Sequence, residues 1–299
     1  MLNIGGCFSK IFNFYRTIRF RLITWDKRLS SLFSKTEIHH NPNWRGKVFL
    51  WQEQALFLGE AANTSFHASP AIKIIIALDG EFLIQTSETG AWQNFKSAII
   101  APGQFHTING QNNKLALIVL VPEAKVAQPL LPILSRKSLS RIPVSVVQNF
   151  LPIFEEFDKM SVESVESDKI CRKMFEKIKN GEELLSAAID SRVSQSIERL
   201  RMEPENHFSV GEIASNVALS ESRFSHLFTE QIGVSVRRYQ LWLRLRDAIH
   251  LLAQGGSLTE TAHEAGFSDS AHLTRTFRQM LGIAPSALLK HSSIIVFHE

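Results

Sequence analysis

The chain has 299 residues, 44% hydrophobic and 21% charged, which is enough apolar sequence to bury two domain cores. No run of about 18 apolar residues occurs, so we expect no membrane-spanning helix, and the two cysteines lack Cys-x-x-Cys spacing, which is typical of a cytoplasmic protein. The net charge of +4 suggests a nucleic-acid partner. However, the basic excess lies in residues 1–40, whereas residues 201–290 are formally neutral.

Residues 1–40 are predicted to be a basic N-terminal extension in which basic and aromatic residues are interleaved. This composition fits an amphipathic segment that lies on a membrane surface. It also fits an extension that docks loosely on the rest of the protein, and we favour this second interpretation.

Residues 41–125 are predicted to be an all-β domain. They contain short apolar runs separated by turn signals such as Asp79-Gly80 and Pro102-Gly103. Six or more short strands of this kind predict a barrel or jelly roll. The runs are 48–51, 55–58, 72–78, 81–84, 97–100 and 115–121.

Two motifs in this domain resemble the metal-binding motifs of cupins. The segment 102–106 resembles the second motif, and the spacing of the first is shared by His67, Ser69, Lys73 and Gly80. The resemblance implies a cupin-like barrel, but Ser69 stands in place of a ligand histidine and Lys73 in place of the carboxylate. Because an ammonium group repels a cation, we expect neither a metal ion nor another cofactor.

His67, Lys73 and His106 are instead predicted to face the barrel interior and to bind a small-molecule effector, with Lys73 pairing with an anionic group. The alternative is that either histidine is an ordinary packed or surface residue.

Residues 126–189 are predicted to be a helical linker. Prolines interrupt its early part, and the Ser- and Glu-rich segment 161–167 is typical of a connection between domains. Apolar residues at helical spacing follow. Such a stripe fits a domain core or a dimer interface, so a homodimer stays open as an alternative.

Residues 190–299 are predicted to be an all-α domain that contains the same two-helix unit twice. Each copy starts with a Ser-x-x-Glu capping box, Ser209 with Glu212 and Ser257 with Glu260, which marks the start of a helix. A second helix follows in each copy and ends at a glycine, a residue suited to the left-handed conformation that ends many helices.

These second helices, 221–232 and 270–281, each have one apolar and one polar face. A two-helix unit with a polar second helix is what reading of the DNA major groove requires. The alternative is a repeat of helical hairpins that binds protein.

A long helix, 235–254, is predicted to connect the two copies. At 1.5 Å per residue it spans roughly 30 Å, which is close to one turn of B-DNA.

The segment 262–285, AHEAGFSDSAHLTRTFRQMLGIAP, resembles the signature of the AraC/XylS family of bacterial transcription regulators, and Ser220 to Phe228 resembles its first-motif counterpart. The resemblance spans about residues 190–290. It implies two helix-turn-helix motifs that bind double-stranded promoter DNA, and activation or repression of transcription through RNA polymerase. The predicted DNA-binding residues are Ser222, Arg223, Ser225, His226, Arg237, Arg244, Ala271, His272, Thr274, Arg275 and Arg278.

In this family a cupin-like N-terminal barrel commonly holds an effector or forms a dimer. We therefore predict a two-domain transcription regulator that responds to a small molecule and is not an enzyme. Two alternatives are a metal-dependent cupin enzyme fused to a DNA-binding module and a protein-interaction repeat without a role on DNA.

Overall fold

The computed structural model describes residues 44–131, 134, 137–159, 189–204 and 207–296. The predicted basic extension, residues 1–40, and residues 160–188 of the predicted linker lie outside the described residues.

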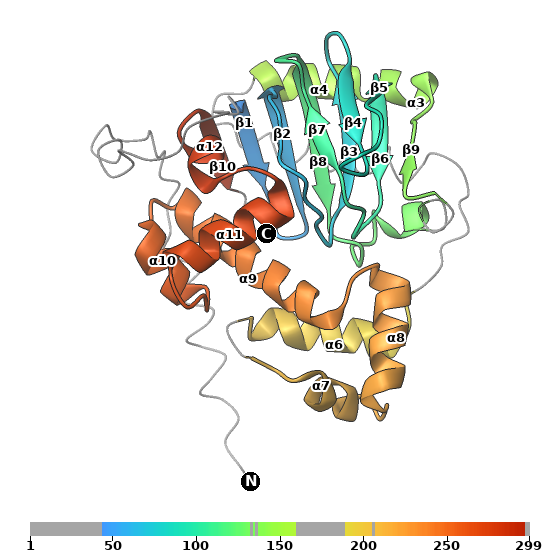
Figure 1. Cartoon of the computed structure of the whole chain (residues 1–299), viewed down its shortest axis with the longest axis vertical. Coiled ribbons are helices and arrows are strands. Elements are labelled where there is room, and N and C mark those ends of the chain that lie inside the picture. Colours follow the sequence, from blue (N-terminus) through green and yellow to red (C-terminus); the bar gives the residue numbers. More distant parts are fainter. Residues whose placement is uncertain (1–43, 132–133, 135–136, 160–188, 205–206, 297–299) are drawn as a thin grey trace.

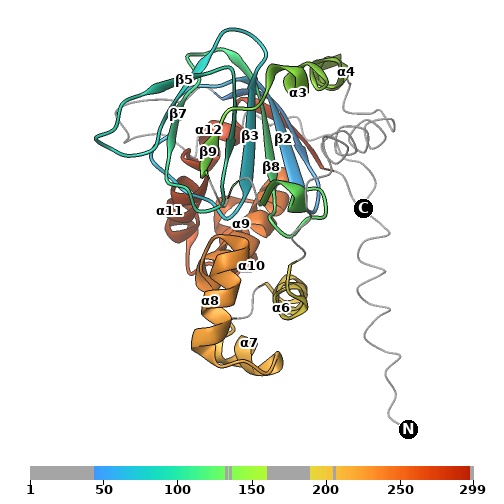
Figure 2. The same ribbon diagram turned by 90° about the vertical axis from the view of Figure 1, so that its right-hand side faces the viewer.

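The N-terminal part of the described chain is built on two β-sheets (Figures 1 and 2). The larger sheet has the strand order β10-β1-β2-β8-β3-β6-β9, and the smaller sheet has the order β5-β4-β7. The strands are β1 (Arg45–Leu50), β2 (Gln54–Glu60), β3 (Ile72–Ala77), β4 (Phe82–Gln85), β5 (Gln93–Phe95), β6 (Ser97–Ile100), β7 (Thr107–Asn109), β8 (Lys114–Leu120), β9 (Leu139–Ser140) and β10 (Ser292–Val296). The six predicted apolar runs coincide with β1, β2, β3, β4, β6 and β8, so this part of the prediction is confirmed.

Strand β3 is buried on both faces, because different layers cover them. Ile72, Ile74 and Ile76 point to the outer face, where they pack with helix α4 (Leu151–Lys159), which follows α3 (Val144–Gln148). Ile75 points to the inner core, which it shares with the smaller sheet. Side chains alternate along a strand, so Lys73 also faces inward.

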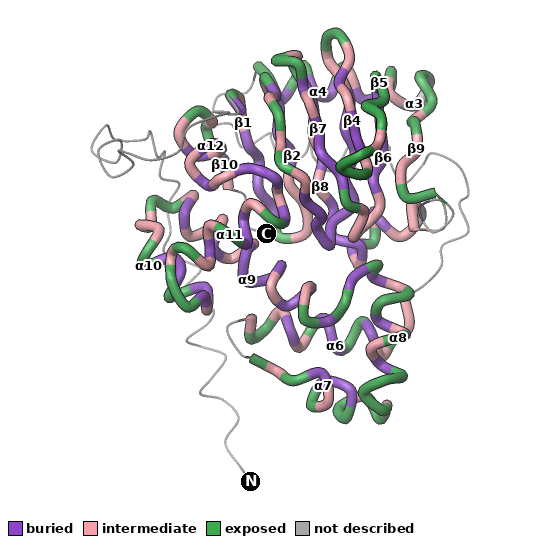
Figure 3. Tube along the Cα trace, viewed as in Figure 1, coloured by how far each residue is buried: buried purple, intermediate pink, exposed green. Residues whose placement is uncertain are grey.

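The C-terminal part of the chain is helical. Its helices are α6 (Ser191–Met202), α7 (Val210–Asn216), α8 (Glu221–Ile232), α9 (Val236–Ala253), α10 (Leu258–Glu264), α11 (Ser270–Leu281) and α12 (Pro285–Leu289). Figure 3 shows buried and exposed stretches alternating along these helices, as expected for helices that each bury one face. Within the described residues, no helix has the length and apolar character needed to cross a membrane.

The predicted helix ends are confirmed. Both capping boxes form, with the hydroxyl of Ser209 accepting from the backbone N–H of Glu212 and Ser257 doing the same for Glu260. Helices α8 and α11 end at Gly233 and Gly282, with left-handed φ values of 84° and 77°. Because such φ values are strained for residues with a Cβ atom, glycine suits both positions.

The C-terminal strand β10 was not predicted. It follows α12 and pairs in parallel with β1, from Gly46 opposite Ser292 to Leu50 opposite Val296. Strand β10 therefore forms one edge of the larger sheet, and the two parts are joined by backbone hydrogen bonds as well as by side chains.

Candidate functional site

Helices α8 and α11 present the polar faces that the sequence predicts. In Figure 1 they lie at opposite ends of α9. On α8, Ser222, Arg223 and His226 are exposed and Ser225 is half-buried. The side chain of Ser220 caps this helix by accepting from the N–H of Arg223.

The corresponding face of α11 is partly exposed. Ala271 and Arg275 are exposed, whereas His272, Thr274 and Arg278 are half-buried. The Thr274 hydroxyl donates to the carbonyl of Ser270 at 2.8 Å. Asp269 caps the helix: its carboxylate accepts from the N–H of His272 at 2.7 Å, and this bond is the first cause of the lowered pKa of Asp269.

The arginines of α9 are in different environments. Arg237 is exposed. Arg244, which was predicted to bind DNA, is only 7% exposed and donates to the Pro204 carbonyl at 3.1 Å and to His207 Nδ1 at 2.7 Å. Arg238 donates to the carbonyl of Ala68 at 2.6 Å, and Arg246 donates to the carbonyl of Gln52. In this arrangement Arg244 therefore bonds to the segment before α7, whereas Arg238 and Arg246 bond to the N-terminal part of the chain.

The three predicted effector residues lie together inside the N-terminal part, where His67, Lys73 and His106 are 1%, 3% and 1% exposed. The Lys73 ammonium nitrogen is in hydrogen-bond contact with His67 Nε2 and lies 3.2 Å from His106 Nε2. The Nδ1 atoms of the two histidines lie 2.9 and 2.8 Å from the carbonyl oxygens of Ser65 and Gln104. Since a carbonyl oxygen only accepts, each Nδ1 carries the proton and each Nε2 offers a lone pair to Lys73.

The electrostatics of this cluster agree with that assignment. Burial lowers the pKa of Lys73 to about 7. Burial first, and then the charge of Lys73, lower the pKa values of His67 and His106 well below their usual value, so both imidazoles are neutral near pH 7.

This donor set does not fit the metal ion of a cupin. Both imidazole lone pairs that would face a metal are directed at the nitrogen of Lys73. Among the residues that the structure describes, no group of three or more His, Cys, Asp or Glu side chains could hold a metal ion.

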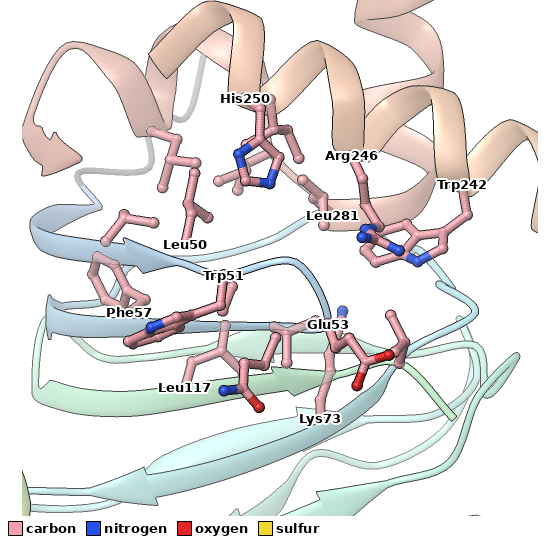
Figure 4. A pocket seen from close by; sticks show the side chains of 18 of the residues that line it. Leu50, Trp51, Glu53, Phe57, Lys73, Leu117, Trp242, Arg246, His250 and Leu281 are labelled. Carbon is pink, nitrogen blue, oxygen red and sulfur yellow. The ribbon is translucent and has the colours of Figure 1, made fainter. Parts of the chain in front are cut away.

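A cavity of about 130 Å³ lies between the sheet and the C-terminal helices (Figure 4). Its walls are mainly apolar side chains from β1, β2 and β8 on one side and from α9 and the end of α11 on the other. Figure 4 shows Lys73, Trp242 and Arg246 directed toward this space. Trp242 and Arg246 line the cavity, and among the described residues Nε1 of Trp242 and Nη1 of Arg246 are buried without a hydrogen-bond partner.

Sequence reasoning did not find this cavity. The only sequence signal is the spacing of Trp242, Arg246 and His250, which places them on one face of α9. The opposite wall comes from strands that lie more than 100 residues earlier, and no local pattern connects the two walls.

A partly buried ion-pair network also joins the two parts. Arg201 of α6 binds Glu53 at 2.9 Å and Glu123 at 2.7 Å, and the hydroxyl of Tyr239 donates to Glu123. Burial by itself lowers the pKa of Arg201, but the neighbouring carboxylates outweigh burial, with Glu123 the larger contributor, and the pKa is raised. Arg201 therefore stays charged and links α6 to the turn between β1 and β2 and to the segment that follows β8.

Comparison with known proteins shows which type of domain the helical part forms. Residues 213–291 match the family model described as a helix-turn-helix domain. The arabinose operon regulatory protein of Salmonella typhimurium is 32% identical over 106 residues, which are 35% of this chain and 38% of that protein. The chain thus spans little more than a third of the length of this relative.

Solved structures show a similar fold over most of the chain. A variant of ToxT from Vibrio cholerae, in its apo form, has a TM-score of 0.59 and 12% identity, and the match covers 81% of this chain and 98% of that one. Wild-type ToxT from the same organism, solved with a bound unsaturated fatty acid, has a TM-score of 0.54 and 13% identity over 81% of this chain and 96% of its own. At this identity the likeness concerns the fold: a sheet-rich N-terminal part and a helical C-terminal part.

The arabinose operon regulators of two bacteria match the chain over about 106 residues each. The duplicated capping boxes, the glycine helix ends and these matches agree. The C-terminal part of the chain is an AraC-type helix-turn-helix domain.

Proposed function

We propose that the protein is a transcription regulator that binds promoter DNA through two helix-turn-helix units, α7–α8 and α10–α11. The observation that supports this proposal most strongly is the repeated geometry of the two units: a capped first helix, a turn, and a second helix with an exposed polar face. We call α8 and α11 the reading helices, because a helix of this kind fits the major groove.

The proposed base-contacting residues lie on these two helices, and Arg237 and Arg278 are proposed to contact phosphates. Arg244 is left out of the contact set, because its guanidinium is buried and holds Pro204 and His207. The residues proposed for base contacts or their support are Ser222, Arg223, Ser225, His226, Ala271, His272, Thr274 and Arg275.

Selection from a random duplex library with the full chain tests this proposal. We expect enriched sequences with two half-sites whose centres lie about 10 base pairs apart. A variant with Arg223→Ala and Arg275→Ala is expected to lose this selection, whereas the charge-matched control with Arg45→Ala and Arg141→Ala, both exposed on the N-terminal part, retains it. Selection of no sequence at all would favour a protein-interaction repeat.

We further propose that residues 41–125 form a cupin-like jelly roll and that the cavity beneath α9 binds the effector. The apolar walls together with Arg246 and Lys73 suit a small carboxylic acid with an apolar chain. The fatty acid bound to ToxT, a protein of similar fold, agrees with this ligand class. Effector binding would then shift the balance between arrangements of the two parts, and with it the action of RNA polymerase at the promoter.

Hexanoate is a suitable probe, because its size is compatible with the cavity of about 130 Å³. Trp242 lines the cavity, so we expect saturable quenching of tryptophan fluorescence by hexanoate but not by hexanol. Replacement Arg246→Met should weaken hexanoate binding by removing a buried donor. Equal responses to acid and alcohol would contradict the proposed charge recognition.

The metal-dependent enzyme, considered as an alternative from the sequence, gains no support from the cluster of His67, Lys73 and His106, since Lys73 takes up the lone pairs that a metal would need.

A further inference from the structure

We propose that Lys73 is a positioning residue that acts as an internal hydrogen-bond donor: it ties together two loops that hold the ends of both reading helices, and so restrains the DNA-binding domain. The first loop is residues 64–69 and contains His67; the second loop is residues 101–106 and contains His106. The inference rests on the proposed DNA-binding function and names how that function is regulated.

The two loops are paired with each other by their backbones. His67 and His106 exchange two N–H to carbonyl hydrogen bonds, each 2.9 Å long, and the N–H of Gly103 donates to the carbonyl of Ser69 at 2.8 Å. Lys73 adds the side-chain link, because its nitrogen is in hydrogen-bond contact with one imidazole from each loop.

The first loop holds the end of α11. The N–H of Ser65 donates to the carbonyl of Gly282 at 2.7 Å, and the Ser65 hydroxyl donates to the same oxygen at 3.0 Å. The N–H of Ala68 donates to the carbonyl of Gln279 at 3.1 Å. A Cβ atom at Gly282 would lie 2.7 Å from Cβ of Thr64, which shows how closely the loop approaches the helix end.

The second loop lies against the end of α8. A Cβ atom at Gly103 would lie 2.6 Å from the carbonyl oxygen of Gly233, and a Cβ atom at Gly233 would lie 3.0 Å from Cβ of Pro102. Each reading helix therefore ends in a glycine that is packed against one of the two loops, and both loops meet at Lys73.

Contacts with the N-terminal part also engage arginines of the helical part, and one of these arginines is bonded to the first loop. Arg238 donates to Ala68 of the first loop, Arg246 donates to Gln52, and Arg201 is paired with Glu53 and Glu123. Loosening the loops frees Arg238 directly and releases the ends of the reading helices from the two loops. Since affinity for DNA increases with the number of phosphates that a protein neutralises, release should tighten DNA binding.

In a cupin of the kind the sequence resembles, a metal ion would join the histidines of the two motifs. Here the side-chain nitrogen of Lys73 takes that position between His67 and His106. Replacing Lys73 by an apolar residue leaves two buried imidazole nitrogens without a donor, an arrangement that favours opening of the loops.

The test compares Lys73→Met with Lys114→Met, a matched replacement at an exposed lysine of β8. Amide hydrogen exchange at Ser65, Ala68 and Gly103 is expected to become at least about tenfold faster in Lys73→Met only, whereas amides within the β1–β2 pair keep their protection. The dissociation constant for a DNA fragment selected by the wild type is expected to fall at least about fivefold in Lys73→Met, within the usual range of coupling between sites.

A second pair of variants tests the inference even if Lys73→Met does not fold. His106→Gln keeps an acceptor for Lys73 and should retain wild-type loop exchange and DNA affinity, whereas His106→Leu should resemble Lys73→Met. Unchanged loop exchange in both Lys73→Met and His106→Leu, or faster exchange without tighter DNA binding, overturns the inference. Absence of DNA binding by the wild-type chain would instead overturn the proposed function, and the exchange data would still test the tie between the loops.

Discussion

At the scale of single residues, the environment distinguishes arginines for which the sequence alone predicts the same role. Arg275 is exposed on the polar face of α11, whereas Arg244 is buried and bonded within the protein. Exposure alone does not distinguish a base contact from a phosphate contact. A base contact affects one position of the DNA site, and a phosphate contact affects all sequences similarly.

Arg275→Ala is therefore expected to cost about 1–3 kcal/mol of binding free energy at one base pair and to relax specificity there. The measurement is binding of wild type and variant to a selected site and to its single-base variants. Arg141→Ala, at an exposed position on the N-terminal part, serves as the control. A uniform loss across all sites would identify Arg275 as a phosphate contact.

Lys73 leads to a prediction about stability and pH. Burial lowers its pKa from 10.5 to about 7, so between pH 7 and pH 10.5 the unfolded chain binds a proton that the folded chain does not. The free energy of unfolding should therefore rise with pH across this window, at about 1.4 kcal/mol for each unit of pKa difference. Urea unfolding at pH 7, 8.5 and 10 should show this rise relative to Lys73→Met, and parallel curves for the two proteins would refute it.

At the scale of elements, short-range hydrogen bonds define the two helix pairs. The carboxylate of Glu212 accepts from the backbone N–H and the hydroxyl of Ser209, and these bonds lower the pKa of Glu212. Helix α7 has only seven residues, so one capping box contributes a substantial part of the stability of the helix.

Ser209→Ala should lower the free energy of unfolding by about 1 kcal/mol, since the replacement leaves an N–H at the helix start without its acceptor. Ser215→Ala in the same helix is the matched control, because the Ser215 hydroxyl only donates to the carbonyl of Gly211 within the helix. Chemical denaturation compares the two, and an equal effect of both replacements would show that the capping box contributes little.

At the scale of the whole molecule, the two parts of the chain are joined by a parallel strand pair, a partly buried ion-pair network and the two loops around Lys73. The strand pair β1–β10 brings the C-terminal end into the N-terminal sheet. Within the described residues, the two parts for which we propose DNA binding and effector binding therefore share one interface.

Arg201→Met should destabilise the protein strongly, by about 3 kcal/mol, because it leaves the carboxylate of Glu123 buried without its cation. The side chain of Glu123 is 7% exposed, whereas that of Glu53 is 37% exposed. Glu53→Gln should therefore cost no more than about 1 kcal/mol, as for other exposed pairs. Urea unfolding of the two variants measures the difference, and equal losses would contradict the assignment.

The sequence by itself determined the features that depend on neighbours three or four residues away. Capping boxes, glycine helix ends and apolar strand runs could be recognised because their hydrogen bonds and side-chain periodicity are local. The motif resemblance identified the helix-turn-helix domain for the same reason.

Only the tertiary structure decided which surfaces meet. The pairing of Lys73 with two histidines, the burial of Arg244, the strand β10 and the cavity under α9 all depend on segments far apart in the chain. All of them depend on which surfaces become neighbours on folding: apolar burial stabilises the packed elements, and hydrogen bonds offset the cost of burying Lys73 and Arg244. A residue's own sequence context does not specify that neighbour.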